Sequence, residues 1–196
     1  MADDLKGIRV AILVTEGFEQ VEMTRPRKAL DDAGAKTFVV SPKEGKVRGF
    51  HHDEKGDEFD VDIRLVDARP EDFDAVLLPG GVFNADNLRM EDRAQEIVRF
   101  MDRNNRPIAV ICHGSWLLVS AGVVKGRTLT SWPTLQDDLR NAGATWQDRE
   151  VIRDRNWVSS RKPDDIPAFN REMVRLFGEL RERKQPGAEA RPELRG

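Results

Sequence analysis

Four short, mainly apolar runs recur along the chain, and they predict the strands of one sheet. The runs are Ile8–Val14, Lys36–Val40, Asp74–Leu78 and Ile108–Ile111. Each is rich in β-branched and aliphatic residues and too short for a helix. Near-continuous apolar character is typical of parallel strands that are buried on both faces. We therefore expect these runs to be the core strands of a parallel sheet.

Between the strands, the apolar positions change to a helical period. Ala94, Ile97, Val98 and Met101 follow the i, i+3, i+4, i+7 spacing and predict an amphipathic helix over 91–104. Glycines that follow apolar stretches mark the ends of other helices. Further helices are expected up to residue 32, directly after residue 112, over 133–142 and over 166–183.

The segment 41–66 does not follow this alternation of strand and helix. Proline and glycine interrupt it repeatedly, and its apolar positions alternate at Phe59, Val61 and Ile63, which predicts a β-hairpin excursion. The whole pattern predicts a doubly wound α/β sandwich with a mostly parallel central sheet. We expect residues 1–183 to form one domain and residues 184–196, which have little to bury, to be a disordered tail.

The composition of the chain argues against several classes of binding partner. The net charge of −3 gives no basic field for nucleic acid, and no apolar run approaches the ~20 residues that a membrane span needs. The acidic N-terminus lacks the apolar core of a signal peptide, and one cysteine cannot form an internal disulfide, so we expect a cytoplasmic protein. Three histidines and one cysteine are poor material for a zinc site, and we expect no metal and no cofactor.

The only cysteine, Cys112, lies where a buried strand turns into a helix. This geometry lifts a side chain to the top of a sheet, as in a nucleophile elbow, and directs the positive end of the helix at the sulfur. A helix terminus lowers a thiol pKa and favours the thiolate. The alternative is a core cysteine, because free cysteines are often buried.

The ends of three strands bring further candidates to the same edge of the sheet. Cys112, the Gly80–Gly81 pair and Glu19 all follow predicted strands, and ligands bind beyond the carboxyl ends of such strands. The N–H groups of Gly81 and His113 are candidate oxyanion donors. The His113 side chain is either an acid/base partner or a packing histidine, and the glycines also suit a tight turn.

Two acidic residues are candidates for the same chemistry. Glu19, if protonated by burial, would donate a hydrogen bond to the sulfur; the alternative is a solvated loop glutamate. Asp86 follows the glycine pair and would orient His113, or it is a helix cap or turn residue. His51 and His52 lie in the predicted hairpin and are expected at the rim of the pocket or on the surface.

Several motifs together resemble the PfpI family, which belongs to the class I glutamine-amidotransferase-like superfamily and is related to the parkinsonism-associated deglycase. Ala109–Gly114 resembles its nucleophile motif, Leu77–Gly81 its glycine turn and Gly17–Glu22 its first loop. The similarity runs from Ile8 to Leu180. It implies a flavodoxin-like domain, Cys112 as nucleophile beside His113, and Glu19 as the acid that touches the sulfur.

The resemblance also implies a homodimer or a higher homo-oligomer, in which an acid from a neighbouring subunit completes the site. Asp86 is the candidate by position, although the segment after Gly81 is one residue longer than in the family's founding peptidase. A second departure is Ser115, where most relatives have proline. No histidine follows His113, which argues against glutaminase chemistry.

Three functions are compatible with these residues. The first is an enzyme that attacks a small carbonyl substrate or a peptide, of the cysteine-peptidase or glyoxalase/deglycase type. The second is a non-catalytic stress sensor in which Cys112 is oxidised to the sulfenate or sulfinate, with Glu19 stabilising the product. The third is a chaperone-like dimer with a vestigial site. The first two predict a thiol pKa well below that of free cysteine.

Overall fold

The computed structural model, which describes residues 4–184, confirms an α/β fold built on a seven-stranded, mostly parallel sheet. Every neighbouring pair is parallel except the outermost one, β11 with β12. Across the sheet the order is β11 (Val151–Asp154), β12 (Trp157–Ser160), β8 (Ile108–Ile111), β7 (Ala75–Leu78), β1 (Arg9–Leu13), β3 (Lys36–Ser41) and β6 (Ile63–Arg64).

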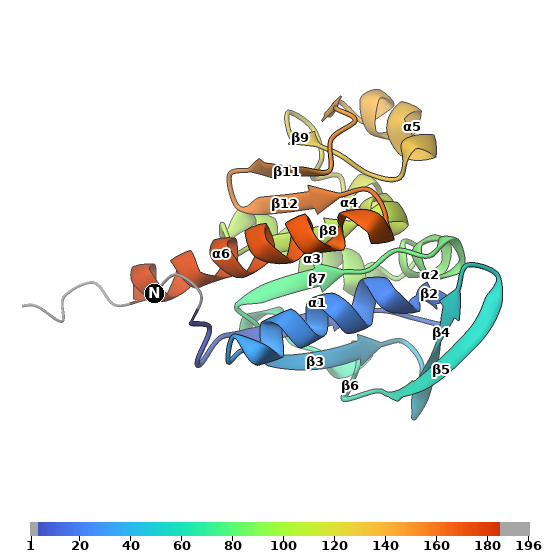
Figure 1. Ribbon diagram of the computed structural model, residues 1–196, viewed down its shortest axis with the longest axis vertical. Helices are drawn as coiled ribbons and strands as arrows, with labels where there is room; N and C mark the ends of the chain where they lie inside the picture. The colour runs from blue at the N-terminus through green and yellow to red at the C-terminus, as the bar shows by residue number, and fades with distance from the viewer. Residues whose placement is uncertain (1–3, 185–196) are drawn as a thin grey trace, which may run out of the picture.

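Helices cover both faces of the sheet, which explains why its central strands are apolar throughout (Figure 1). Along β1, Val10 and Ile12 pack into one hydrophobic cluster and Ala11 and Leu13 into the other. The first cluster is covered by α1 (Gln20–Asp32) and α6 (Ile166–Lys184), which lie side by side. The opposite cluster is covered by α2 (Val82–Leu88), α3 (Asp92–Arg103) and α4 (Ser115–Ser120).

The predicted excursion is a hairpin, and it lies against the loop that follows β1. The antiparallel strands β4 (Lys46–His51) and β5 (Glu54–Asp60) form a three-stranded sheet with β2 (Phe18–Glu19). Because β2 pairs in parallel with β4 and leads directly into α1, the hairpin forms a wall beside the carboxyl ends of the central strands.

The region after α4 is less regular than the sequence predicts. The strand β9 (Thr128–Leu129) has only two residues and pairs with β10 (Thr145–Trp146). The helix expected over 133–142 begins with a 3-10 turn and continues as α5 (Gln136–Asn141). Further 3-10 turns span Leu65–Asp67, Pro70–Asp72, Cys112–Gly114 and Pro163–Asp165.

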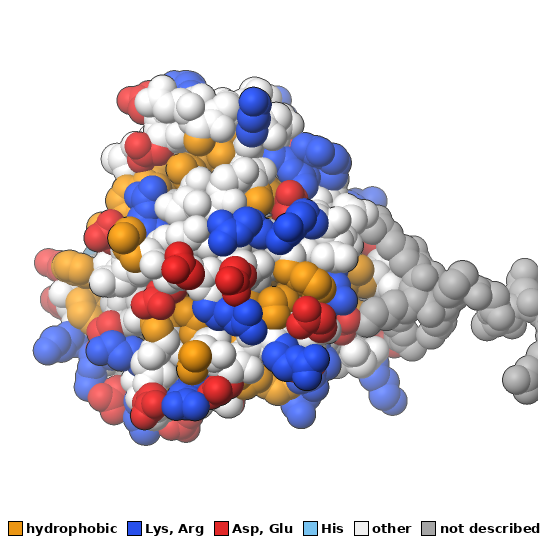
Figure 2. Space-filling view, turned by 180° about the vertical axis from the view of Figure 1, so that it is seen from behind, with side chains coloured by type: hydrophobic (Ala, Val, Ile, Leu, Met, Phe, Trp, Pro, Cys, Tyr) orange, Lys and Arg blue, Asp and Glu red, His pale blue; other side chains and the backbone are white. Residues whose placement is uncertain are grey.

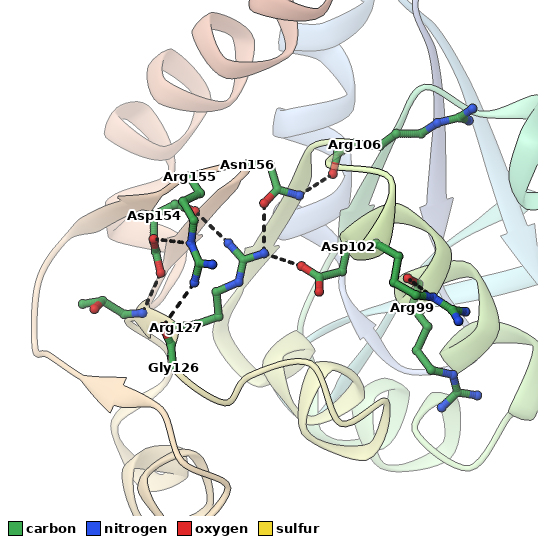
Figure 3. A network of polar contacts seen from close by, with 10 residues as sticks. Arg99, Asp102, Arg106, Gly126, Arg127, Asp154, Arg155 and Asn156 are labelled. Carbon is green, nitrogen blue, oxygen red and sulfur yellow. Dashed lines mark hydrogen bonds and ion pairs between the residues drawn. The ribbon is translucent and has the colours of Figure 1, made fainter.

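A buried arginine stabilises the sheet at the amino end of β8 (Figure 3). The Arg127 guanidinium pairs with Asp102 at the end of α3, donates to the Asn156 side chain at 3.0 Å and lies 4.3 Å from the Trp157 ring. The network joins α3, β9 and the turn between β11 and β12. It lies at the opposite end of β8 from Cys112.

The distribution of charged side chains on the surface agrees with the small net charge of the chain. On the side facing away from the viewer of Figure 1, lysine and arginine are interspersed with aspartate and glutamate (Figure 2). Within residues 4–184, none of the helices is long and apolar enough to cross a membrane. Most of the tail predicted over 184–196 lies outside the described residues, and Lys184 is the last residue of α6.

Candidate active site

Cys112 directly follows β8 and adopts a left-handed backbone conformation, with φ of 59°. Non-glycine residues rarely occupy this region, which costs roughly 1–2 kcal/mol, and such residues cluster at functional sites. The strained residue begins a 3-10 turn that leads into α4. The predicted sharp junction of strand and helix is therefore confirmed. The cysteine is also largely buried, with 6% of its surface exposed.

Glycines allow the backbone to approach the cysteine closely. A Cβ on Gly80 would lie 2.6 Å from the Cβ of Cys112, and a Cβ on Gly114 would lie 2.6 Å from the carbonyl oxygen of Leu78. Gly81 has φ of 89° and faces the backbone of the loop after β1. As a result, the N–H groups of Gly81 and His113 both donate to the Cys112 sulfur. These are the two amides that the sequence suggests as oxyanion donors.

The carboxyl group that contacts the sulfur belongs to Glu22, and not to Glu19 as the sequence suggests. Glu22 lies in the first turn of α1 and is fully buried. Its Oε2 accepts the Gly80 N–H at 2.9 Å, and its side chain is hydrogen-bonded to Cys112. Its Oε1 is buried without a hydrogen-bond partner in the described part of the chain. Burial, reinforced by the charge of Glu19, raises the pKa of Glu22 to about 8.

Glu19 lies on a different wall of the same site. It is the last residue of β2, and its Oε2 accepts the backbone N–H of His52 at 3.0 Å. The reason for the difference is where α1 begins. Glu19 precedes the helix in extended conformation, whereas Glu22 is turned by the helix toward the sulfur. A sequence that places carboxylates at both positions does not distinguish them unless the first helical residue is known.

The side chains of Cys112 and His113 meet although they are adjacent in sequence. Sγ lies 3.2 Å from His113 Nδ1, because the left-handed backbone at Cys112 turns both side chains to one side. The imidazole packs edge-on against Trp116 and stacks on Trp132, with ring centroids 5.3 and 6.0 Å away. Burial lowers the pKa of His113 to about 4, so the imidazole is neutral at physiological pH and one nitrogen accepts a proton.

The expectation of a low thiol pKa is wrong. Burial raises the pKa of the Cys112 thiol well above its ordinary value, and the Glu22 carboxylate, once ionised, raises it further. The N–H groups of His113 and Gly81 act in the opposite direction without offsetting burial. The resting site therefore holds a neutral thiol, and this proton must leave when the sulfur reacts.

Asp86 does not belong to the site formed by a single chain. It lies on the exposed side of α2 and, within residues 4–184, has no hydrogen bond or ion pair. His52 does reach the site: its side chain is 85% exposed and lines the rim of the cavity. His51 is exposed on the hairpin.

Cys112 opens into a cavity of about 500 Å³. This size suits a small molecule or one side chain. Aromatic rings of Phe83 and Trp132 form part of its wall, and Phe83 in turn lies 6.0 Å from the Phe50 ring of the hairpin. The lining residues are Glu19, Glu22, His52, Asp53, Gly81, Val82, Phe83, Cys112, His113, Trp132, Thr134 and Pro163.

Comparison with known sequences agrees with this geometry. A sequence model of the DJ-1/PfpI family matches residues 8–176. A protein of Thermococcus kodakarensis named as a deglycase is 42% identical over 170 residues, which cover 87% of this chain and 99% of the relative. YraA of Bacillus subtilis, whose name provisionally describes it as a cysteine protease, is 40% identical over 86% of this chain and 98% of its own length.

Solved structures from the same family have the fold that is seen in this chain. A ThiJ/PfpI domain protein from Brachyspira murdochii superposes with a TM-score of 0.81 at 21% identity, over 89% of this chain and 98% of that one. DJ-1beta of Drosophila melanogaster superposes with a TM-score of 0.78 at 25% identity, over 90% and 94% of the two chains. Sequence and structure together place this chain in the DJ-1/PfpI family.

Proposed function

We propose that this protein is a cysteine-dependent enzyme of the glyoxalase/deglycase type that acts on small carbonyl compounds. The observation that carries the proposal is the 3.2 Å contact between Cys112 Sγ and a neutral His113 nitrogen, at the base of a cavity where two backbone amides point at the sulfur. The names of the archaeal relatives support the deglycase type. The single cysteine supports action in the cytoplasm.

The first step uses His113 as the base. With the imidazole proton on Nε2, Nδ1 accepts the thiol proton while sulfur bonds to the aldehyde carbon and the carbonyl electrons move to oxygen. The N–H groups of Gly81 and His113 stabilise that oxygen. The imidazolium then returns its proton, giving a hemithioacetal. Glu22, protonated at neutral pH, donates a hydrogen bond to the sulfur and so limits the charge on it.

A 2-oxoaldehyde provides the simplest complete reaction. In its hemithioacetal, His113 removes the proton from the former aldehyde carbon, and a proton is returned to the neighbouring ketone carbon. The product is a thioester of Cys112. Water cleaves this thioester and releases a 2-hydroxy acid and the free thiol, so atoms balance without a cofactor or an external oxidant.

Turnover of methylglyoxal to lactate tests the proposal. We expect lactate from the wild type and none above background from Cys112→Ala, with a fluorogenic peptide assayed in parallel. Cysteine-dependent lactate formation supports the small-carbonyl enzyme. Peptide cleavage without lactate contradicts it and favours a peptidase.

The peptidase alternative rests on the exposed position of Asp86. We propose that the protein forms homo-oligomers in which Asp86 of one subunit approaches the His113 of another, since Asp86 has no partner within the described part of its own chain. Sedimentation would give the oligomeric state. Asp86→Asn should lower peptide cleavage without affecting the fold if this assignment is correct.

A redox role is the second candidate function. The sulfur is bordered by two amide donors and by the Glu22 carboxyl group, which holds a proton at neutral pH. One peroxide oxidises the thiol to a sulfenic acid with release of water, and a second gives the sulfinate, whose oxygens these donors would bind. If methylglyoxal and peptide are both inert while peroxide modifies Cys112, the sensor is favoured.

A further inference from the structure

Two tryptophans border the His113 imidazole, and they have different places in the site. Trp132 stacks on the imidazole at an angle of 26° and lines the cavity. Trp116, in the first turn of α4, meets the imidazole edge-on, with ring centroids 5.3 Å apart. It is not among the described residues that line the cavity. A substrate in the cavity would therefore contact Trp132, whereas Trp116 can act on the reaction only through His113.

Side chains from two other helices fix the ring of Trp116. Its Nε1 donates to Asp138 Oδ2 in α5 at 2.9 Å, and the Arg89 guanidinium, at the end of α2, lies 5.3 Å from the ring centroid. Arg89 is held in turn, because its Nε donates to Ser120 Oγ in α4 at 2.9 Å. Trp116 thus joins α2, α4 and α5 directly beside His113.

The imidazole has little else to fix its orientation. Within residues 4–184, the only hydrogen-bond partner of its side chain is the Cys112 sulfur, 3.2 Å from Nδ1. A base must stay within hydrogen-bond reach of the proton that it takes, and a small displacement is costly to the rate. The ring contact with Trp116 restricts rotation of the imidazole and helps to keep it buried, with 8% of the His113 surface exposed.

We propose that Trp116 is a positioning residue for the reaction: it holds the His113 imidazole within reach of the Cys112 sulfur, and Asp138 holds Trp116 in place from α5. The inference rests on the role of His113 as the base in the carbonyl chemistry proposed above. It gives a function to α5, which contributes no described residue to the lining of the cavity.

The charged groups near the imidazole do not explain why it is neutral. They come from β2, α1, the hairpin, the end of β8, α2 and α5: Glu19, Glu22, His52, Asp53, Cys112, Arg89 and Asp138. The pKa of His113 is lowered by burial. Removing a ring that shields the imidazole from water should therefore raise this pKa toward its ordinary value of 6.5.

NMR titration of the imidazole tests the role of Trp116 without requiring turnover. The chain has three histidines, and the signal that is missing in His113→Asn belongs to His113. Trp116→Leu removes the ring, and Asp138→Ala removes only the acceptor of its N–H. We expect the pKa of His113 to rise from about 4 by at least ~1 in Trp116→Leu, and by a smaller amount in Asp138→Ala.

Two matched variants separate the position of the ring from the charge of the carboxylate. Asp138→Asn keeps an oxygen that accepts the indole N–H, so the pKa of His113 should stay at its wild-type value. Asp137→Ala removes the neighbouring carboxylate, which pairs with Arg140, and should also leave the pKa unchanged. Equal rises in Asp138→Asn and Asp138→Ala would mean that the charge acts on His113 directly, and would contradict the proposal.

Methylglyoxal kinetics on the same samples complete the test. Trp116→Leu should lower kcat by at least ~10-fold and leave KM within about twofold, because the base is displaced while the lining of the cavity is kept. If Trp116→Leu does not fold, Asp138→Ala, at an exposed position, should show the same change to a smaller extent.

An unchanged pKa of His113 in both Trp116→Leu and Asp138→Ala overturns the proposal. A raised pKa in proteins that form no lactate leaves the support of His113 by Trp116 standing and refutes the proposed enzyme. Cysteine-dependent lactate formation with the pKa and kcat unchanged in both variants does the reverse.

Discussion

At the scale of single residues, the site depends on one carboxyl group that is buried against a thiol. Glu22 lies beneath the glycine turn, hydrogen-bonded to Gly80 and Cys112. Its pKa of about 8 means that the folded protein holds a proton there at neutral pH, whereas the unfolded chain, with a value of 4.5, does not. A raised acid pKa stabilises the fold only at low pH. This contribution is complete below 4.5 and is lost as the pH rises to about 8.

Glu22→Gln should therefore change the pH dependence of stability. Between pH 6.5 and 8 the wild type should lose up to about 2 kcal/mol of unfolding free energy through this group, and the variant should lose much less. Urea denaturation of both proteins at several pH values in this range measures the loss of unfolding free energy. His113 does not interfere, because its stabilising contribution, from a lowered pKa, is lost only as the pH falls below about 6.5. Parallel curves for the two proteins would refute the assignment.

The identity of the acid shows what a sequence can and cannot predict about a residue. The motif around Cys112 predicts the reactive cysteine, and the glycine pair predicts the amides that meet it. The choice between Glu19 and Glu22 depends on α1 beginning at Gln20, a boundary that periodicity does not define to one residue. The thiol pKa differs from the prediction for another reason: the sequence indicates the helix terminus, which lowers the pKa, but not the depth of burial, which raises it.

At the scale of elements, one asparagine holds the glycine turn in place. Asn84, in the first turn of α2, is fully buried. Its Oδ1 accepts the Thr15 N–H at 2.7 Å, and its Nδ2 donates to the carbonyls of Pro79 and Gly80 at 3.1 and 3.0 Å. It thus joins the end of β1 to the turn whose amides point at Glu22 and Cys112.

Asn84→Ala should lower kcat for methylglyoxal by at least tenfold with a smaller change in KM, because the oxyanion donors lose their fixed position. It should also cost roughly 2–3 kcal/mol of stability through the unpaired backbone groups. Asn87→Ala is the control, since Asn87 is exposed on the same helix and its side chain donates to the carbonyl of Phe83 in that helix. Equal effects of the two substitutions would show that Asn84 has no special role.

Most elements could be predicted from the pattern alone. The run Ile108–Ile111 coincides with β8, and the predicted helix over 91–104 contains α3. Buried parallel strands and amphipathic helices leave strong periodic signals. Short elements such as β10 and the 3-10 turns Leu65–Asp67 and Pro70–Asp72 leave no such signal, because their conformation depends on the segments packed around them.

At the scale of the whole molecule, the reactive cysteine and the stabilising arginine network lie at opposite ends of the central strands. Cys112 follows the carboxyl end of β8, whereas the Arg127 network closes the opposite edge, where Asn156 and Arg106 precede β12 and β8 (Figure 3). Strand order and this clustering depend on contacts between distant segments, which a single sequence does not reveal.

Arg127→Ala should destabilise the protein by about 3 kcal/mol, because Asp102 and Asn156 lose a buried partner. Turnover by the folded fraction should stay within twofold of the wild type. Lys28→Ala, which breaks an exposed ion pair with Asp32 in α1, should cost less than about 1 kcal/mol. A similar loss in both variants, by urea denaturation, would contradict a structural role for the network.

The central claim is that His113 takes the proton of a buried, neutral Cys112 thiol, and the most direct test is the rate of lactate formation by His113→Asn. Asparagine keeps a polar side chain but cannot act as the base. The account predicts that kcat/KM for methylglyoxal at pH 7 falls by at least ~100-fold relative to the wild type. A rate within a few-fold of the wild type, in a variant that folds normally, would contradict it.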